Sequence, residues 1–434
     1  MKYENNWESL NKREVPSWFE DAKFGIFIHW GLYSVPAYAP KGKYAEWYGY
    51  HCDEITERSA NDREYYDYHQ KTYGGNFKYN DFVDKFKAEN FDAEQWVKLF
   101  EDAGAKYMNL VSKHHDGFCL FKSKYAWNWN SVDVGPHRDF CRELKDACDK
   151  SDVKFGVYHS VYEWFHPLYL KNPEEYATEH LIPMLKELIE EYKPATLFTD
   201  GEWEHPSSVW HSTDFLQWLY NESSVKDYIV PNDRWGKETR GRLGGNLTTE
   251  YGLICVDEDI EAIDRVSEEC RGIGASFGWN RFETVDDYLS EEALIKMLVD
   301  LVSKGSNFLL NVGPTDDGRI PVIMEERLRQ LGQWLKINGE GIYCSRKYCP
   351  KSSDENIKYT KHKDNGPVFA FIHNYPFGKI VFNDVDYRDG MKVSLLGCDK
   401  ALEAVNENGK LAVDFGFINP DELNSKYVYT LKIN

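Results

Sequence analysis

Residues 106–121 read KYMNLVSKHHDGFCLF, and in them an apolar stretch passes directly into His114, His115 and Asp116. Side chains of these types can do three kinds of chemistry. They can bind a metal ion, relay a proton, or hold a polar ligand through hydrogen bonds. A solvated polar loop without a chemical role is the fourth interpretation. The choice depends on the element that carries the segment and on the residues that lie beside it.

The spacing of the two histidines argues against a metal site. Successive strand residues point to opposite faces of a sheet, so His114 and His115 cannot both bind one ion while the strand continues. Zinc ligands are usually spaced a few residues apart and joined by Cys or a third His, and this segment does not supply such a set. Neutral imidazoles hydrogen-bond well to hydroxyl groups. We therefore expect a grip on a polar ligand, with no metal.

Polar and aromatic residues follow other apolar stretches in the same way. They are His29-Trp30, Glu46-Trp47-Tyr48, Tyr158-His159, and Trp203 shortly after Asp200. Aromatic residues make up 15% of the chain, with 14 Trp and 29 Tyr, which is more than core packing requires. Such an excess is typical of a cleft for a ligand with apolar faces, such as a sugar ring.

The elements that would position these residues alternate between strands and helices over the first 340 residues. Apolar runs typical of strands lie at residues 24–31, 106–113, 153–160, 195–201, 228–236 and 307–314. Helical stretches lie at residues 91–104, 138–151, 183–194, 290–305 and 325–341. These stretches carry apolar residues at i, i+3, i+4 and i+7, as Leu294, Met297, Leu298 and Leu301 do.

This alternation predicts a parallel sheet, and the unbroken apolar strands predict that both of its faces are buried. Polar residues follow the strands at their carboxyl ends, where a barrel builds its active site. We therefore expect an α/β fold with a (β/α)8 TIM-like catalytic barrel over residues 1–345. An open, doubly wound sheet is the alternative, but no glycine-rich phosphate turn follows the first strand.

The pattern changes from residue 346 onward. Short strand-like segments are separated by Asp-Asn-Gly, Arg-Asp-Gly and Asn-Gly turns, and no helical pattern interrupts them. We predict that residues 346–434 form a small C-terminal antiparallel β-sandwich.

A sugar ligand raises the question of a pair of carboxyl groups, because glycoside hydrolysis uses two. Asp200 ends the strand-like run TLFTD, where an oriented carboxylate could attack an anomeric carbon. Its partner would come from another loop, and the chain offers Glu261, Glu268, Glu269 and Glu283. The residues alone do not choose among these four glutamates.

Composition limits the partners and the compartment. A net charge of −20 argues against nucleic acid and anionic membranes as partners, because both require a basic surface. The first residues contain no apolar signal-peptide core, and no apolar run is long enough for a membrane span. Nine scattered cysteines fit reduced thiols, so we expect a cytoplasmic protein, although a trimmed secreted or lysosomal chain would begin in the same way. Homo-oligomerisation stays open.

Seven segments together resemble the α-L-fucosidases of glycoside hydrolase family 29. They are WFEDAKFGIFIHWGLYSVPAYA, KHHDGFCLF, FGVYHS, FTDGEW, NDRWG, RGIGASFGWNR and GSNFLLNVGPTDDG, which follow one another within residues 7–345. The C-terminal region is similar in kind but less specific. The resemblance implies a retaining exo-α-L-fucosidase that releases terminal α-L-fucose from glycans or glycosides through a covalent glycosyl-enzyme intermediate. It implies no cofactor and no metal.

The resemblance also implies roles for individual residues. Asp200 is the expected nucleophile and Glu283 the expected acid/base. The chain has Phe198 and Ser267-Glu268 where members of the family often have Trp and Trp-Glu, and Glu268 is therefore the reserve acid/base. The implied fucose contacts are His29, Glu46, Trp47, His114, His115, Tyr158 and Arg271. We expect Arg271 or the histidines to keep the pKa of Asp200 low.

Other functions compete with this one. A non-catalytic fucose-binding protein on the same barrel is the first, and a retaining glycosidase for a related sugar is the second. A metal-dependent hydrolase is the last.

Overall fold

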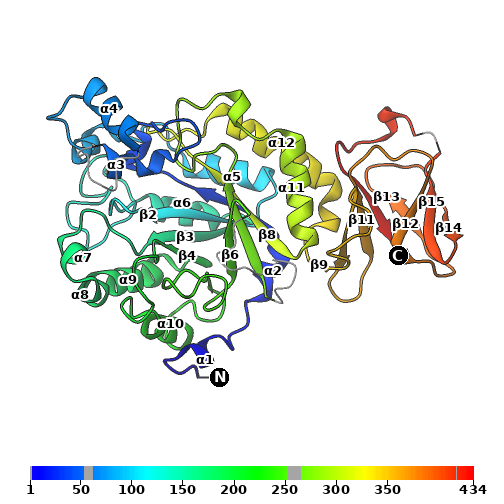
Figure 1. The fold of residues 1–434 in the computed structure, drawn as a ribbon, viewed down its shortest axis with the longest axis horizontal. Coiled ribbons are helices and arrows are strands. Elements are labelled where there is room, and N and C mark those ends of the chain that lie inside the picture. Colours follow the sequence, from blue (N-terminus) through cyan, green and yellow to red (C-terminus); the bar gives the residue numbers. More distant parts are fainter. Residues whose placement is uncertain (1, 53–61, 253–264, 417) are drawn as a thin grey trace.

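Eight parallel strands form one curled sheet at the centre of the larger part of the chain (Figure 1). The computed structural model describes residues 2–52, 62–252, 265–416 and 418–434. The strands run in the order β5-β4-β3-β2-β1-β8-β7-β6. Their bounds are β1 (Phe24–Ile28), β2 (Tyr107–Lys113), β3 (Lys154–Ser160), β4 (Thr196–Asp200), β5 (Val230–Pro231), β6 (Leu247–Glu250), β7 (Ser267–Gly272) and β8 (Ser306–Val312). A parallel bridge between Asn232 and Asn246 joins the two edges just beyond β5 and just before β6.

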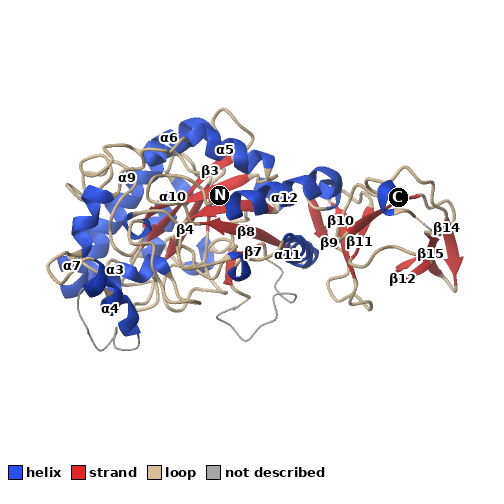
Figure 2. Cartoon of the chain, turned by 90° about the horizontal axis from the view of Figure 1, so that it is seen from above, coloured by secondary structure: helices blue, strands red, loops and turns tan. Residues whose placement is uncertain are grey.

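Helices surround this sheet, so the expected TIM-like barrel is confirmed (Figures 1 and 2). The longer helices are α4 (Arg63–Thr72), α5 (Ala93–Asp102), α6 (Phe140–Cys148), α9 (Ile182–Tyr192), α10 (Ser212–Asn221), α11 (Glu291–Ser303) and α12 (Val322–Asn338). The shorter ones are α1 (Trp7–Leu10), α2 (Ser17–Ala22), α3 (Tyr48–His51), α7 (Pro167–Lys171) and α8 (Pro173–Tyr176). No helix among the described residues combines the length and apolar character that crossing a membrane requires.

Local sequence explains where the predicted helices begin. The side chains of Asp92, Asp139 and Ser290 each accept a hydrogen bond from a backbone N–H in the first turn of α5, α6 and α11. Such caps satisfy donors that have no partner inside the helix. The apolar face of each helix then packs on the sheet, as Leu294 and Leu298 of α11 do in the barrel core.

Two barrel strands, β6 and β7, were not expected from the sequence. Their sequences, LTTE and SEECRG, are polar, yet both strands are almost entirely buried. The other barrel strands are mostly apolar on both faces, and this pattern is what predicts them from the sequence. β6 and β7 bury polar side chains against other polar groups, so a search for apolar runs passes over them.

The C-terminal part consists of two antiparallel sheets, as expected for the small β-sandwich. One has the order β13-β16-β11-β10-β9 and the other the order β12-β15-β14. Their bounds are β9 (Ser345–Lys347), β10 (Ile357–His362), β11 (Val368–Ile372), β12 (Lys379–Asp386), β13 (Val393–Leu395), β14 (Ala404–Glu407), β15 (Lys410–Asp414) and β16 (Tyr429–Ile433). Both sheets contribute to one buried cluster, which includes Tyr359, Phe382, Leu411 and Leu431.

The sandwich packs beside α11 and α12 of the barrel (Figure 1). Phe369 and Phe371 of β11 belong to the same buried cluster as the barrel core. The indole N–H of Trp334 in α12 donates to the carbonyl oxygen of Val428 at 3.0 Å. The two parts therefore share a continuous core. The exact division between residues 345 and 346 stays a prediction.

Candidate active site

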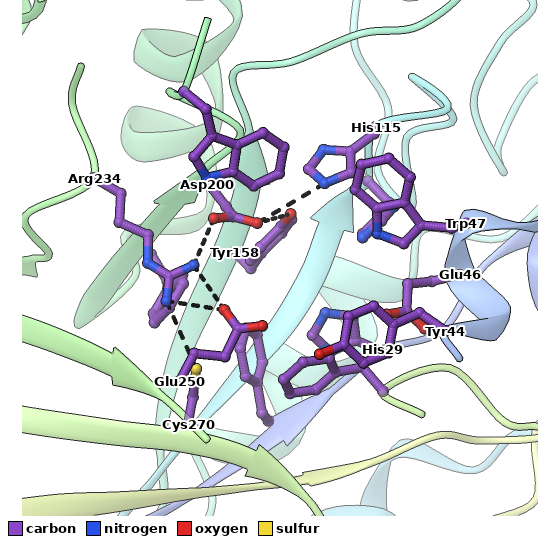
Figure 3. A pocket seen from close by; sticks show the side chains of 15 residues that line it. His29, Tyr44, Glu46, Trp47, His115, Tyr158, Asp200, Arg234, Glu250 and Cys270 are labelled. Carbon is purple, nitrogen blue, oxygen red and sulfur yellow. Dashed lines mark hydrogen bonds and ion pairs between the residues drawn. The ribbon is translucent and has the colours of Figure 1, made fainter. Parts of the chain in front are cut away.

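A cavity of about 220 Å³ opens at the carboxyl ends of the barrel strands (Figure 3). Its walls come from strands or strand ends all around the barrel. The lining residues are Phe27, His29, Tyr44, Glu46, Trp47, His114, His115, Tyr158, Phe198, Asp200, Trp203, Arg234, Glu250, Cys270 and Phe277. This is the place where a barrel presents its chemistry.

Asp200, the last residue of β4, is the most tightly held carboxylate in the cavity. Gly201 turns the chain away immediately after it with φ of +84°, a conformation that favours glycine. Oδ1 accepts hydrogen bonds from Nη1 of Arg234 at 2.6 Å and from Nη2 of Arg240 at 3.3 Å. Oδ2 accepts one from the hydroxyl of Tyr158 at 3.1 Å. Burial acts to raise the pKa of Asp200, but the two guanidiniums and His115 outweigh it and lower the pKa to about 2.

Arg234 joins Asp200 to a second carboxylate, Glu250 at the end of β6 (Figure 3). Nη1 of Arg234 donates to Oδ1 of Asp200 at 2.6 Å and also to Oε2 of Glu250 at 3.2 Å. The sum of these two distances, 5.8 Å, is therefore the upper limit for the separation of the two oxygens. Retaining glycosidases hold their two carboxyl groups roughly 5–5.5 Å apart. The pair fits that geometry.

A third carboxylate lies behind Asp200, on the other side of Arg240. Glu202 accepts hydrogen bonds at Oε1 from the guanidinium of Arg240 at 2.9 Å, while Arg240 also binds Asp200. Glu202 is only 2% exposed. Its burial raises its pKa to about 7, although Arg240 acts in the opposite direction. Asp200 thus stands at the centre of a chain of alternating carboxyl and guanidinium groups, Glu250–Arg234–Asp200–Arg240–Glu202.

Two histidines of the cavity are held in one tautomer. Asn311 donates through Nδ2 to the carbonyl of Phe277, so its Oδ1 faces His29 and accepts from Nδ1 at 2.7 Å. Ser160 donates its hydroxyl proton to the carbonyl of Tyr162, so it accepts from Nδ1 of His115 at 2.6 Å. Nδ1 therefore carries the proton in both rings, which leaves Nε2 as a hydrogen-bond acceptor.

Burial keeps these imidazoles neutral. It lowers the pKa of His29 to about 3 and that of His115 to about 4, and it holds the pKa of His114 well below its ordinary value. The ring of His114 stacks on Tyr158, with 5.8 Å between centroids. Neutral acceptors of this kind suit ligand hydroxyl groups, as the sequence predicted for the His-His pair.

Glu46 supplies a further buried carboxyl group to the cavity. It accepts a hydrogen bond from the backbone N–H of Gly278 at 2.8 Å. Burial raises its pKa to about 7. The neighbouring walls are apolar, formed by Phe27, Phe198 and Phe277. The cavity therefore combines acceptors for hydroxyl groups with a hydrophobic side, as a deoxy sugar requires.

Most of the predicted site residues meet in this cavity. Those that line it are Asp200, His29, Glu46, Trp47, His114, His115 and Tyr158. Three predicted residues, Arg271, Glu268 and Glu283, are not among the lining residues. Arg271 lies with its guanidinium carbon 5.0 Å from the centre of the Tyr251 ring, and the low pKa of Asp200 comes from Arg234 and Arg240 in its place.

The two glutamates expected as acid/base have other surroundings. Glu283 accepts the backbone N–H groups of Ala275 at 2.8 Å and Ser276 at 3.0 Å, so it fixes the loop that carries Phe277. Glu268 accepts from the hydroxyl of Tyr107, which is the first residue of β2 and lies at the opposite end of the barrel from the cavity. Glu269 instead binds Thr249 and the backbone of Gly252. Glu261 lies outside the described residues.

Sequence reasoning missed Arg234, Arg240 and Glu250. Arg234 lies in the segment NDRWG, which carries part of the resemblance, but the sequence alone assigns it no role. Glu250 was missed with its strand, because LTTE lacks the apolar pattern of the other strands. If β6 were recognised from the sequence, the place of Glu250 at the end of this strand would make it a candidate site residue.

One group of side chains in the described part of the chain brings three metal-binding atoms together, outside the cavity. It consists of Glu163, His166 and His180. Glu163 already accepts hydrogen bonds from Nζ of Lys113 and from the hydroxyl of Tyr176, both at 2.8 Å. The lysine compensates the carboxylate charge, so we interpret the group as a buried ion pair and not as a metal site.

Comparison with known proteins places these features in a family context. The family model for α-L-fucosidase matches residues 1–340, and the model for the α-L-fucosidase C-terminal domain matches residues 351–434. The α-L-fucosidase of Dictyostelium discoideum is 41% identical over 407 residues, covering 92% of this chain and 86% of that protein. Tissue α-L-fucosidase of Bos taurus is 39% identical over 444 residues, covering 100% and 91%. The crystal structure of Thermotoga maritima α-fucosidase with a mechanism-based inhibitor superimposes with a TM-score of 0.83 at 36% identity, over 100% of both chains.

Proposed function

The chain belongs to the α-L-fucosidase family and is a glycoside hydrolase that acts on α-L-fucose, and we propose that it does so by a retaining double displacement with Asp200 as nucleophile and Glu250 as acid/base. The observation that carries this proposal is the guanidinium of Arg234, which holds both carboxylates with their oxygens at most 5.8 Å apart. That separation leaves room for direct attack on a sugar carbon and too little for an intervening water.

Asp200 is suited to the nucleophilic role. Its pKa of about 2 keeps it ionised throughout the neutral range, and its two oxygens are fixed by Arg234, Arg240 and Tyr158. In the first step an Asp200 oxygen forms a bond to the anomeric carbon of fucose while the bond to the leaving oxygen breaks. The negative charge of the carboxylate is lost in the resulting ester.

Glu250 is suited to the acid/base role because of its position. Its side chain is 29% exposed, whereas the other candidate carboxyl group in the cavity, Glu46, is 2% exposed. The leaving group of an exo-acting enzyme points out of the pocket, so the acid must stand at the opening. Glu250 gives its proton to the leaving oxygen, and its charge then replaces that of Asp200 beside Arg234. In the second step Glu250 takes a proton from water while the water oxygen bonds to the anomeric carbon. The bond from that carbon to Asp200 breaks, which releases fucose and restores both the Asp200 carboxylate and the protonated Glu250.

The remaining predicted contacts fit recognition of the sugar. Nε2 atoms of His29 and His115 accept hydroxyl protons, and Glu46 binds a further hydroxyl. The phenylalanine wall is placed to receive the methyl group of the deoxy sugar. The predicted roles of His114, Trp47 and Tyr158 as fucose contacts are kept as part of this proposal. In this proposal Arg234 has the role that the resemblance implied for Arg271.

The substrate is therefore a fucosylated glycan or glycoside. A cytoplasmic location, turnover without metal or cofactor, and the oligomeric state stay predictions. Activity that is unchanged by EDTA would support turnover without a metal ion.

The stereochemistry of the product tests the mechanism. The chain is mixed with para-nitrophenyl α-L-fucoside, and the first anomer released is followed by proton NMR before mutarotation. Retention predicts α-L-fucose as the initial product. Initial release of β-L-fucose would exclude the double displacement, and absence of turnover would favour the fucose-binding protein instead.

A further inference from the structure

The cavity has an aromatic rim, formed by Tyr44, Trp47 and Trp203, and the proposed reaction assigns no role to Trp203. Of its fifteen lining residues, eleven are buried and three are half-buried, namely Tyr44, Trp47 and Glu250. Trp203 is the one exposed residue of the set, at 40%. These four residues are the ones that solvent reaches, so they mark the mouth of the cavity: Trp203, two other aromatic residues and the proposed acid.

The size of the cavity fixes what can lie inside it. A volume of about 220 Å³ is below the ~300–1,000 Å³ that is usual for pockets of drug-sized ligands. It holds one sugar ring and no longer saccharide. The rest of any substrate must therefore lie outside, beyond the oxygen that Glu250 protonates. Because Glu250 is itself a residue of the mouth, that part of the substrate emerges between Glu250 and the aromatic rim.

Trp203 is held firmly at this position. Its ring is stacked on Trp47, with 6.2 Å between centroids and 27° between planes. It meets the ring of His115 edge-on at 5.5 Å and that of Tyr162 at 6.0 Å. These contacts order the indole without burying it. A pre-ordered, partly exposed aromatic ring offers contact area to a ligand at little entropic cost.

We propose that Trp203, supported by Trp47, forms the binding subsite for the first sugar of the aglycone, and that this sugar is an uncharged pyranose. The apolar C–H face of a pyranose packs on the indole. The four residues of the mouth, Tyr44, Trp47, Trp203 and Glu250, include no cation and one carboxylate. Among these four described residues, an anionic aglycone would therefore meet a carboxylate and no positive charge. This proposal rests on the proposed function. It adds which kind of aglycone the enzyme prefers.

The test compares two substrates on one preparation of each enzyme. The first is α-L-fucosyl fluoride, whose leaving group is too small to reach the subsite. The second is whichever of the α1-2, α1-3, α1-4 and α1-6 fucosyl disaccharides the wild type cleaves best. The ratio of kcat/KM for disaccharide over fluoride cancels any loss of folded enzyme. We expect Trp203→Ala to lower this ratio about tenfold and Trp203→Phe to lower it less.

Trp127 provides the matched control. It is 78% exposed and does not line the cavity, so Trp127→Ala is expected to keep the wild-type ratio.

The charge preference is tested with a sulfated aglycone. A disaccharide that carries a sulfate on its aglycone is expected to be cleaved about tenfold more slowly than the uncharged form. An unchanged ratio in Trp203→Ala, or a wild type that cleaves the fluoride and none of the disaccharides, would overturn the subsite. Equal rates on sulfated and uncharged forms would overturn the charge preference. A wild type that is inactive on the fluoride would refute the proposed function itself.

Discussion

Asp200 and Glu250 bind the same atom, Nη1 of Arg234, at 2.6 and 3.2 Å. One cation therefore faces both carboxylates, and it remains beside a negative charge whichever of the two is ionised. In the proposed reaction, charge leaves Asp200 when the ester forms and appears on Glu250 when its proton departs. Arg234 can compensate both states without moving, so the site needs little reorganisation between them.

Loss of the nucleophile should abolish turnover. For Asp200→Ala we expect kcat on para-nitrophenyl α-L-fucoside to fall by at least about a thousandfold, because no other group is placed to form the ester. Added azide should restore part of the activity by entering the space left by the carboxylate. The product would be the fucosyl azide of inverted configuration, identified by NMR. Near-wild-type turnover in Asp200→Ala would refute the mechanism.

Loss of the acid should depend on the leaving group. For Glu250→Ala we expect kcat/KM to fall about 10²- to 10⁴-fold on a fucosyl disaccharide and far less on an aryl fucoside, whose leaving group needs no proton. Azide should here give the fucosyl azide of retained configuration. Glu283→Ala is the control, since Glu283 binds backbone N–H groups of a loop. Glu283→Ala should lose activity equally on both substrates. If Glu283→Ala instead loses far more activity on the disaccharide than on the aryl fucoside, while Glu250→Ala does not, the acid/base is Glu283.

Glu202 should tune the nucleophile through Arg240. With its pKa of about 7, Glu202 is neutral in mildly acidic solution and ionised at pH 8. When ionised it competes for Arg240 and leaves more charge on Asp200 for attack. We expect Glu202→Gln to match the kcat/KM of the wild type at pH 5.5 and to fall to about a third of it at pH 8.

The ratio of variant to wild type cancels the titration of other groups, including Glu46. Glu204→Gln is the control, because Glu204 binds the hydroxyl of Tyr169 and does not line the cavity. Its ratio should not vary with pH. A Glu202→Gln ratio that is constant from pH 5.5 to 8 would show that Glu202 does not act on Asp200.

Glu268 should make the fold less stable as pH rises. Its burial raises its pKa to about 7, above the ~4.3 of an unfolded Glu. The folded chain therefore holds a proton that the unfolded chain releases, and the stability contributed by the protonated form is lost between pH 4.3 and 7. The penalty at pH 8 is ~4 kcal/mol. Glu268→Gln should raise the Tm slightly at pH 5 and by more at pH 8. A rise of the same size at both pH values would contradict this, and Glu407→Gln, at a side chain that is 37% exposed, serves as control.

Several elements of the site were predictable from the sequence because they follow a repeated pattern. Apolar strands that end in His29, His114 or Asp200 place those residues at one end of a barrel, whatever the details of packing. Helices such as α5 and α11 follow from their periodicity and caps. The binding of ligand hydroxyl groups by the imidazoles also follows from residue type and position, and it stays a prediction.

The proposed acid/base and the two arginines beside Asp200 were not predictable in the same way. Glu250 lies on a strand of four residues with polar side chains, so neither length nor apolarity marks it. Arg234 and Arg271 both follow strand-like segments, and only tertiary packing brings one guanidinium to Asp200 and the other to Tyr251. Glu283 and Glu250 also differ only in what tertiary packing places beside them, because the hydrogen-bond partner of a carboxylate is a property of the folded chain.

The neutral state of the cavity histidines has a consequence for where the enzyme can work. His29 and His115 change charge only near pH 3 and pH 4, so the acceptors that face the sugar are the same in acidic and in neutral surroundings. Acidification would then leave the imidazole acceptors unchanged and act through the carboxyl groups, among them Glu46 with its pKa of about 7. The same histidines serve acidic and neutral surroundings, and adaptation to either is left to the carboxyl groups.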